Sequence, residues 1–221
     1  MNARRYDWVF LDMDGTLADT LPLLYEAYSD FLNAYGKAPA RAEFEALNGP
    51  ALPEIVAALK TAHGLAKSEA VLLEHYHRLL MERLARGGPA IAGAGALVDT
   101  LTERGYRLML VTSSPATVAR AFVSRHGWAN RFEAIVSGEH VERAKPDPAI
   151  YQHALEQSGA QADRAVVIED AVNGVRAAVA AGMTVIGVAC NHDASTLVKA
   201  GAERVAPDLH ALRNWIEEDT W

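Results

Sequence analysis

The chain has 221 residues, of which 50% are hydrophobic and 22% are charged, and its 28 acidic and 21 basic residues give a formal net charge of -7. This composition is typical of a soluble globular protein with a sizeable core, and an acidic balance without a Lys/Arg-rich run argues against nucleic acid or an anionic membrane as a partner. With one cysteine, Cys190, no signal-peptide h-region and no apolar run long enough to span a bilayer, we expect a cytoplasmic protein without an internal disulfide.

The first predicted element is a buried strand over Trp8–Leu11, which runs directly into the stretch Asp12-Met13-Asp14-Gly15-Thr16. Two carboxylates this close together at the end of a buried strand would raise one another's pKa and resist burial. Something must compensate for them, and a divalent cation would do so.

Residues 18–88 show helical periodicity in place of strands. Apolar residues fall on three helical stripes, which run from Leu24 to Tyr35, from Leu52 to Leu59 and from Leu72 to Arg83. Gly87-Gly88-Pro89 then closes the segment. We therefore expect a helical insertion over residues 18–88, sufficient for a lid, between the two parts of a core formed by residues 1–17 and 89–221.

After the insertion, short apolar segments alternate with helical patterns. Because these segments are rich in Val, Ile and Leu and show little alternation, they predict the strands of a parallel sheet covered on both faces. Ser114-Pro115 and Asp147-Pro148 each predict a helix start, and Gly159 predicts a helix end. The pattern indicates an α/β fold with a doubly wound parallel sheet. The predicted strands are Arg107–Val111, Ala134–Val136, Ala165–Ile168, Thr184–Val188 and Arg204–Ala206.

Polar side chains follow four of the predicted strands, at the edge of a parallel sheet where ligands bind. Four carboxylates beside one lysine would repel one another, and a hard divalent cation, most simply Mg2+, would balance them. Hydroxyls beside a helix start, together with the lysine, would form a site for phosphate. The residues concerned are the acids Asp12, Asp14, Glu169 and Asp170, the hydroxyl residues Thr112 and Ser113, and Lys145.

Taken together, these motifs resemble those of the haloacid-dehalogenase (HAD) superfamily. The matching segments are DxDGTL from Asp12, Thr112 after an apolar strand, Lys145 in KPDP, and Glu169-Asp170 in IEDAVNG. All four occur in order, and the resemblance covers essentially the whole chain. It implies a HAD-like Rossmannoid core with residues 18–88 as an inserted α-helical cap domain. The implied activity is hydrolysis of a phosphoric monoester, with a small phosphorylated metabolite as substrate.

The resemblance also implies a role for each matching residue. Asp12 corresponds to the nucleophile that forms an aspartyl-phosphate intermediate, and Asp14 to the general acid/base. Thr112 corresponds to the hydroxyl that binds the transferring phosphoryl group, and Lys145 to the lysine that steadies this group and the nucleophile. The implied Mg2+ ligands are Asp12, the backbone carbonyl of Asp14, Asp170 and, as a further acid, Glu169.

Several alternative functions within and beyond the family can be compared with these residues. Dehalogenases and phosphonate-cleaving members lack the second acid of the first motif, so Asp14 argues against both. β-Phosphoglucomutase-type enzymes carry a histidine early in the cap where this chain has Leu24, which favours a phosphatase. The stretch LNGPALPEI looks like the substrate-facing loop of phosphoglycolate-phosphatase-like relatives, which makes Asn48 and Gly49 candidate substrate contacts. A catalytically silent metal- or phosphate-binding protein is an alternative from a different class, and the chain could be a monomer or a homodimer.

Overall fold

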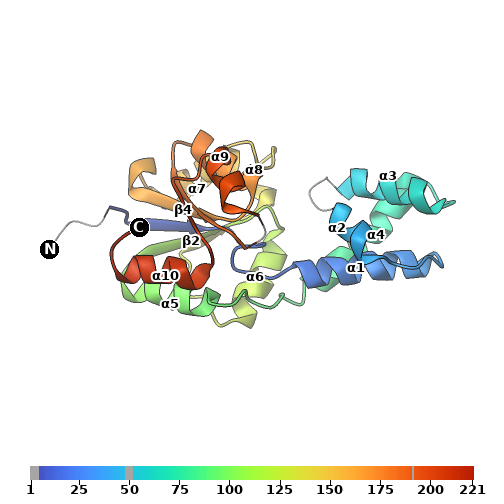
Figure 1. The fold of residues 1–221 in the computed structure, drawn as a ribbon, viewed down its shortest axis with the longest axis horizontal. Helices are drawn as coiled ribbons and strands as arrows, with labels where there is room; N and C mark the ends of the chain where they lie inside the picture. The colour runs from blue at the N-terminus through green and yellow to red at the C-terminus, as the bar shows by residue number, and fades with distance from the viewer. Residues whose placement is uncertain (1–4, 48–51, 191) are drawn as a thin grey trace. The chain divides into compact units, whose positions relative to one another are not determined.

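The computed structural model describes residues 5–47, 52–190 and 192–221. The chain divides into two compact units, one formed by Met1–Asp19 with Pro89–Trp221 and the other by Thr20–Gly88 (Figure 1). Among the described helices, none combines the length and the apolar character that crossing a membrane requires.

The first unit is built on a parallel six-stranded sheet with the strand order β3-β2-β1-β4-β5-β6. The central strand β1 pairs with β2 on one side and with β4 on the other, and the apolar character of all three strands suits burial on both faces. The chain order reverses at β1, so the carboxyl ends of these strands border a topological switch point. This sheet confirms the predicted α/β fold class. The strands are β1 (Trp8–Leu11), β2 (Arg107–Val111), β3 (Ala134–Val136), β4 (Ala165–Glu169), β5 (Thr184–Val188) and β6 (Arg204–Ala206).

Helices cover both faces of this sheet. Figure 1 shows α7, α8 and α9 on one face, and α5, α6 and α10 on the other. The α7–α9 face carries an apolar core in which Phe10 and Val167 of the sheet join Tyr151 and Ala178 of the helices. The helices are α5 (Ala94–Glu103), α6 (Ala116–Arg125), α7 (Ala149–Ser158), α8 (Val172–Ala180), α9 (Ala194–Ala200) and α10 (Leu209–Glu217), with short 3-10 helices η1 (Gly138–His140) and η2 (Ala162–Arg164).

Two of the predicted helix starts differ from the structure by one residue. The residues that cap α6 and α7 are Pro115 and Pro148, so each proline precedes its helix and does not occupy the first turn. Asp147 still accepts a hydrogen bond of 3.0 Å from the backbone amide of Ala149. Gly159 ends α7 with a φ of 67°, the left-handed conformation that glycine adopts without steric cost, as predicted.

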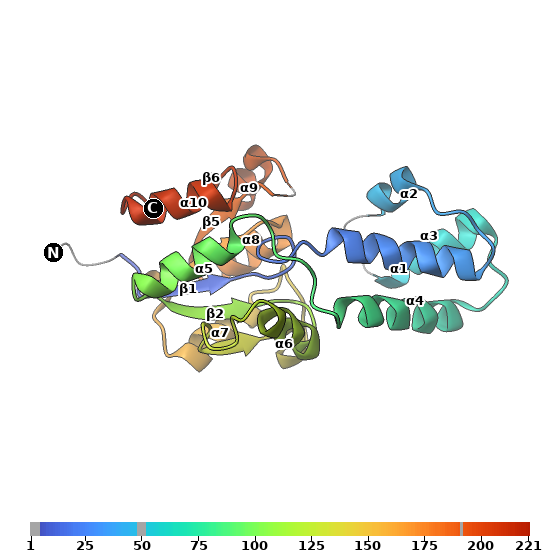
Figure 2. The same cartoon turned by 90° about the horizontal axis from the view of Figure 1, so that it is seen from below.

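The second unit is helical and has its own apolar core. Helices α1 and α4 pack side by side (Figure 2), and Arg83 of α4 forms ion pairs with Glu26 and Asp30 of α1. The three predicted stripes lie on α1, α3 and α4, whereas the short α2 was not predicted because only Phe44 of its six residues is buried. The helices are α1 (Leu21–Ala34), α2 (Arg41–Ala46), α3 (Leu52–His63) and α4 (Glu69–Leu84).

Candidate active site

A buried ion-pair arrangement lies at the carboxyl ends of β1 and β4. The register of these strands places Asp12 beside Glu169, because Leu11 is opposite Ile168 and the amide of Asp12 donates to the carbonyl of Ile168. Nζ of Lys145 lies between the two carboxylates, 2.7 Å from Oδ1 of Asp12 and 2.7 Å from Oε1 of Glu169. The Lys145 side chain is only 8% exposed, so the ammonium and both carboxylates are largely removed from water.

Burial and the neighbouring charges shift the pKa values of Asp12 and Lys145. Burial raises the pKa of Asp12 well above its ordinary value, and the neighbouring Glu169 carboxylate raises it further. Burial alone would lower the pKa of Lys145, but the carboxylates of Asp12 and Glu169 outweigh that effect and hold its pKa well above the ordinary value. The lysine therefore stays charged, and its one positive charge faces the two acidic side chains of Asp12 and Glu169.

Asp14 lies two residues after Asp12, in the turn that follows β1, and its side chain reaches the loop after β2. Gly15 allows this turn with a φ of 89°, a conformation that favours glycine. Oδ2 of Asp14 accepts hydrogen bonds of 3.0 Å from the Thr112 hydroxyl and 2.7 Å from the Ser114 hydroxyl. The structure thus brings together Asp14 and Thr112 as the motif order implies, and adds Ser114. From the sequence, Ser114 was expected only as a helix cap, although its position two residues after Thr112 on a loop could have suggested it.

The loop after β2 is fixed from the side of β3. The amide of Ala116 donates to the Glu139 carboxylate, and a Cβ at Gly138 would lie 2.3 Å from the carbonyl oxygen of Ser113. Gly138 therefore lets η1 approach this loop closely. Ser113, predicted as a phosphate contact, occupies an exposed position on the loop.

Three buried acids could hold a cation. Asp12, Glu169 and Asp170 each offer a carboxylate oxygen, and these oxygens lie within 4.8 Å of one another. The Thr16 hydroxyl donates a 2.9 Å hydrogen bond to Oδ1 of Asp170, which orients this carboxylate. Because the donors are all oxygens, and carboxylates outnumber the one lysine, the site fits a hard divalent cation.

The two other predicted ligands differ in their surroundings. The Asp14 side chain is not part of the three-acid group, so a contribution of Asp14 would come from its backbone carbonyl. Glu169 belongs to the group but is also tightly held, since its Oε2 accepts a 3.0 Å hydrogen bond from the amide of Ala171. A Cβ at Gly174 would lie 1.6 Å from Oε1 of Glu169, so only glycine leaves room for this carboxylate.

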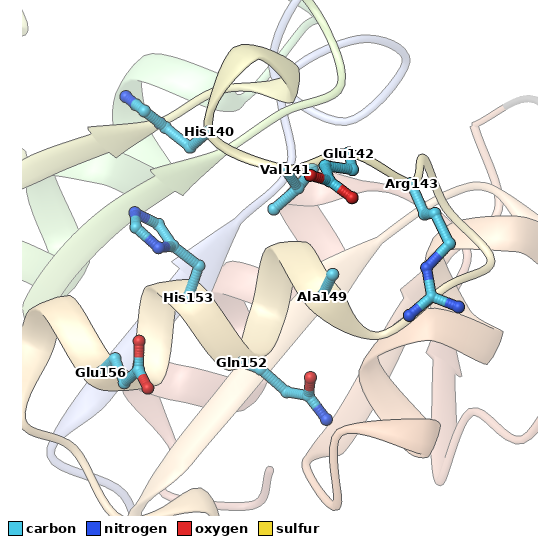
Figure 3. A pocket seen from close by; sticks show the side chains of 8 residues that line it. All are labelled: His140, Val141, Glu142, Arg143, Ala149, Gln152, His153 and Glu156. Carbon is cyan, nitrogen blue, oxygen red and sulfur yellow. The ribbon is translucent and has the colours of Figure 1, made fainter.

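Asn48 and Gly49, the predicted substrate contacts, lie outside the described residues. A separate pocket of about 350 Å³ lies between η1 and α7, and Figure 3 shows the polar side chains that line it, among them His140 and His153. His140 is fixed there because its Nδ1 accepts a 3.0 Å hydrogen bond from the amide of Ser137. None of the acids of the buried cluster lines this pocket.

Comparisons with known proteins agree with the resemblance seen in the motifs. The family model of the haloacid dehalogenase-like hydrolases matches residues 9–188. The chain is 31% identical over 220 residues to the phosphoglycolate phosphatase of Rhodospirillum rubrum, and the match covers 94% of this chain and 90% of that protein. It is 32% identical over 200 residues to the phosphorylated carbohydrates phosphatase of Thermotoga maritima, over 88% of this chain and 91% of that protein. Among solved structures, a candidate β-phosphoglucomutase from Thermotoga maritima superposes with a TM-score of 0.84 at 28% identity, covering 96% of this chain and 99% of that chain.

Proposed function

The chain belongs to the haloacid dehalogenase-like hydrolase family, and we propose that it is a Mg2+-dependent phosphatase of a small phosphorylated metabolite, acting through an aspartyl-phosphate intermediate. The observation that carries the proposal is the buried Lys145 ammonium between Asp12 and Glu169, next to a second acid, Asp14, that hydroxyl groups hold. A protein that only binds phosphate needs neither a nucleophile nor a proton donor. The names of two relatives direct the substrate class to phosphoglycolate or a sugar phosphate.

Asp12 is the proposed nucleophile. Lys145 binds its Oδ1, which orients the carboxylate and offsets part of the repulsion between two anions. That repulsion is about 1 kcal/mol for a pair of unit charges at 4 Å in water and about 4 kcal/mol at an effective dielectric constant of 20. A buried ammonium at this position acts where negative charge develops during transfer.

Asp14 is the proposed general acid and base. It would give a proton to the leaving oxygen of the substrate and then take one from the water that hydrolyses the aspartyl-phosphate. Thr112 serves two partners in this scheme, because the hydroxyl that donates to Asp14 is also the proposed donor to the phosphoryl group. When the phosphoryl group accepts this bond, Asp14 keeps its bond from Ser114 and turns toward the leaving oxygen.

The proposed metal ligands are Asp12, Asp170, the backbone carbonyl of Asp14 and, as a further acid, Glu169. When bound, Mg2+ would neutralise charge on the phosphoryl oxygens and on the carboxylates. Thr16 holds Asp170 in place for this role. The charge of the buried acids would then be balanced while Lys145 keeps its ion pairs with Asp12 and Glu169.

Phosphate release from a panel of phosphorylated metabolites, with Mg2+ or with EDTA, tests the proposal. The panel contains phosphoglycolate, hexose and pentose phosphates and nucleoside monophosphates. Metal-dependent release is the expected result, with the preferred compound identifying the substrate. Interconversion of hexose phosphates without release would favour a mutase, the activity after which the similar Thermotoga maritima structure is named. Binding of Mg2+ and phosphate without turnover of either kind would indicate a silent binding protein.

A further inference from the structure

We propose that Tyr151 is a positioning residue for phosphoryl transfer, because its hydroxyl and its ring hold the Lys145–Glu169 pair that in turn orients Asp12. The inference rests on the proposed function, and it adds a residue from α7 that lies outside the four motifs.

The contacts of Tyr151 reach both members of the pair. Its hydroxyl donates a hydrogen bond of 3.2 Å to Oε1 of Glu169, the oxygen that also accepts from Lys145. Nζ of Lys145 lies 5.0 Å from the centroid of the Tyr151 ring, within the range of a cation–π interaction. The three protons of the ammonium have acceptors in Asp12, Glu169 and the carbonyl of Val111, so the ring adds a fourth contact to the lysine.

The hydroxyl of Tyr151 is not needed for packing. The side chain is fully buried in the apolar core on the α7–α9 face of the sheet, where phenylalanine would fill the same space. A buried hydroxyl lowers stability unless it is hydrogen-bonded, so the hydrogen bond that Glu169 accepts is the physical reason for a tyrosine here.

Glu169 accepts hydrogen bonds from Lys145, Tyr151 and the backbone amide of Ala171. The absence of a side chain at Gly174 leaves the space that the Glu169 carboxylate occupies. Lys145 and Tyr151 both donate to Glu169, and Tyr151 can be changed without removing a charge from the site. Its substitution therefore isolates the positioning of Lys145 from the presence of Lys145.

The experiment compares Tyr151→Phe with Tyr6→Phe, which removes the hydroxyl of another buried tyrosine just before β1, at the opposite end of the sheet. With saturating Mg2+ and the preferred substrate, we expect kcat to fall about 10-fold in Tyr151→Phe, as for one lost hydrogen bond to a charged group, while KM changes less than about 2-fold. Tyr6→Phe should keep the wild-type kcat. Unchanged kcat in Tyr151→Phe would overturn the proposal.

A second background separates positioning from general stability. In Glu169→Ala the acceptor is gone, so adding Tyr151→Phe should change kcat by less than about 2-fold. If the 10-fold fall persists in that background, Tyr151 acts through general packing and the inference is wrong. Should Tyr151→Phe not fold, as judged by its thermal midpoint, Gly174→Ala perturbs the same contact from the other side. It should lower kcat at least as much, and a wild-type kcat there would also contradict the proposal.

Binding of orthophosphate in the presence of Mg2+, measured by calorimetry, keeps this inference separate from the proposed function. If the wild-type chain binds phosphate but turns over no compound, the phosphatase proposal fails while the inference is still tested. We then expect Tyr151→Phe to bind orthophosphate about 5-fold more weakly than Tyr6→Phe, by the same loss of orientation at Lys145. Equal affinities of the two variants would overturn it.

Discussion

The hydroxyl of Ser114 lies 2.7 Å from Oδ2 of Asp14 and donates to the same oxygen that accepts from Thr112. The amide of Ser114 also donates to the Thr112 hydroxyl, so the three side chains form one connected group. Because Thr112 is the proposed phosphate contact, Ser114 is the partner that can hold Asp14 while Thr112 binds the phosphoryl group.

Ser114→Ala should therefore impair proton transfer more than substrate binding. We expect kcat to fall about 3- to 10-fold, which corresponds to one hydrogen bond of about 0.5–1.5 kcal/mol, with a smaller change in KM. Ser124→Ala, an equivalent change at an exposed position of α6, is the control for steady-state kinetics. A wild-type kcat in Ser114→Ala would show that Asp14 does not need the hydrogen bond from Ser114.

Lys145→Ala should lower kcat/KM by about 100-fold or more, the usual cost of removing a donor from the position where charge develops. Lys145→Arg should not keep the wild-type kcat/KM, because a planar guanidinium cannot take the place of a compact ammonium that lies 2.7 Å from each of two carboxylates. The exposed Lys199 provides the control substitution, Lys199→Ala. An unchanged kcat/KM in Lys145→Ala would refute the role given to this lysine.

Thr16→Val tests the orientation of Asp170. The substitution keeps the shape of a fully buried side chain but removes the donor to Oδ1 of Asp170. We expect the Mg2+ concentration for half-maximal activity to rise about 10-fold, within the range known for residues that orient metal ligands, while kcat at saturating Mg2+ recovers. Thr102→Val on α5 removes a hydroxyl that donates to the carbonyl of Val98 in the same helix, and it is the control. If Thr16→Val left the Mg2+ dependence unchanged, Asp170 would not need this support.

Asp12→Asn should stabilise the metal-free fold near neutral pH. The pKa of Asp12 is raised in the folded chain, so folding favours its protonated form. The contribution of this carboxyl to stability is present below its unfolded pKa of about 3.9 and is lost as pH rises through the folded value. In EDTA we expect the thermal midpoint of Asp12→Asn to exceed that of the wild type by on the order of 2–4 °C per kcal/mol gained, and the difference to be larger at about pH 8 than at about pH 4.

The matched change at an exposed acid is Asp163→Asn, which should alter stability by less than about 0.5 kcal/mol at either pH. A lower midpoint for Asp12→Asn at alkaline pH would mean that the pair with Lys145 outweighs the burial of Asp12. The sign of the difference therefore decides which interaction dominates.

The sheet and the acids at its edge could be predicted because their signals are local. Short apolar runs without alternation indicate buried parallel strands, and parallel strands bring their carboxyl ends to one edge. That rule alone placed Asp12, Thr112 and Asp170 at the same edge. The family resemblance, which the comparisons confirm, then supplied the order and expected roles of these residues.

The supporting residues could not be predicted because their partners are distant in sequence. Thr16 bonds to Asp170 across 154 positions, and Ser114 bonds to Asp14 across 100. Tyr151 lies in the helix predicted before Gly159, and its hydroxyl has a partner because the fold brings Glu169 of β4 beside it. Helix α2 was missed for a different reason, since one buried side chain in six residues gives no periodicity.

If Asp12 attacks phosphorus, a phosphorylated intermediate forms on its carboxylate, and trapping this intermediate is the decisive experiment. The preferred substrate, carrying a radiolabelled phosphoryl group, is mixed with the Asp14→Asn variant and Mg2+, quenched in acid within one turnover and digested for mass spectrometry. Because the water-activating acid is removed, we expect a hydroxylamine-sensitive label on the peptide that contains Asp12, and none when Asp12→Asn is combined with Asp14→Asn. Label on another residue, or phosphate release by the Asp12→Asn single variant at the wild-type rate, would show that Asp12 is not the nucleophile.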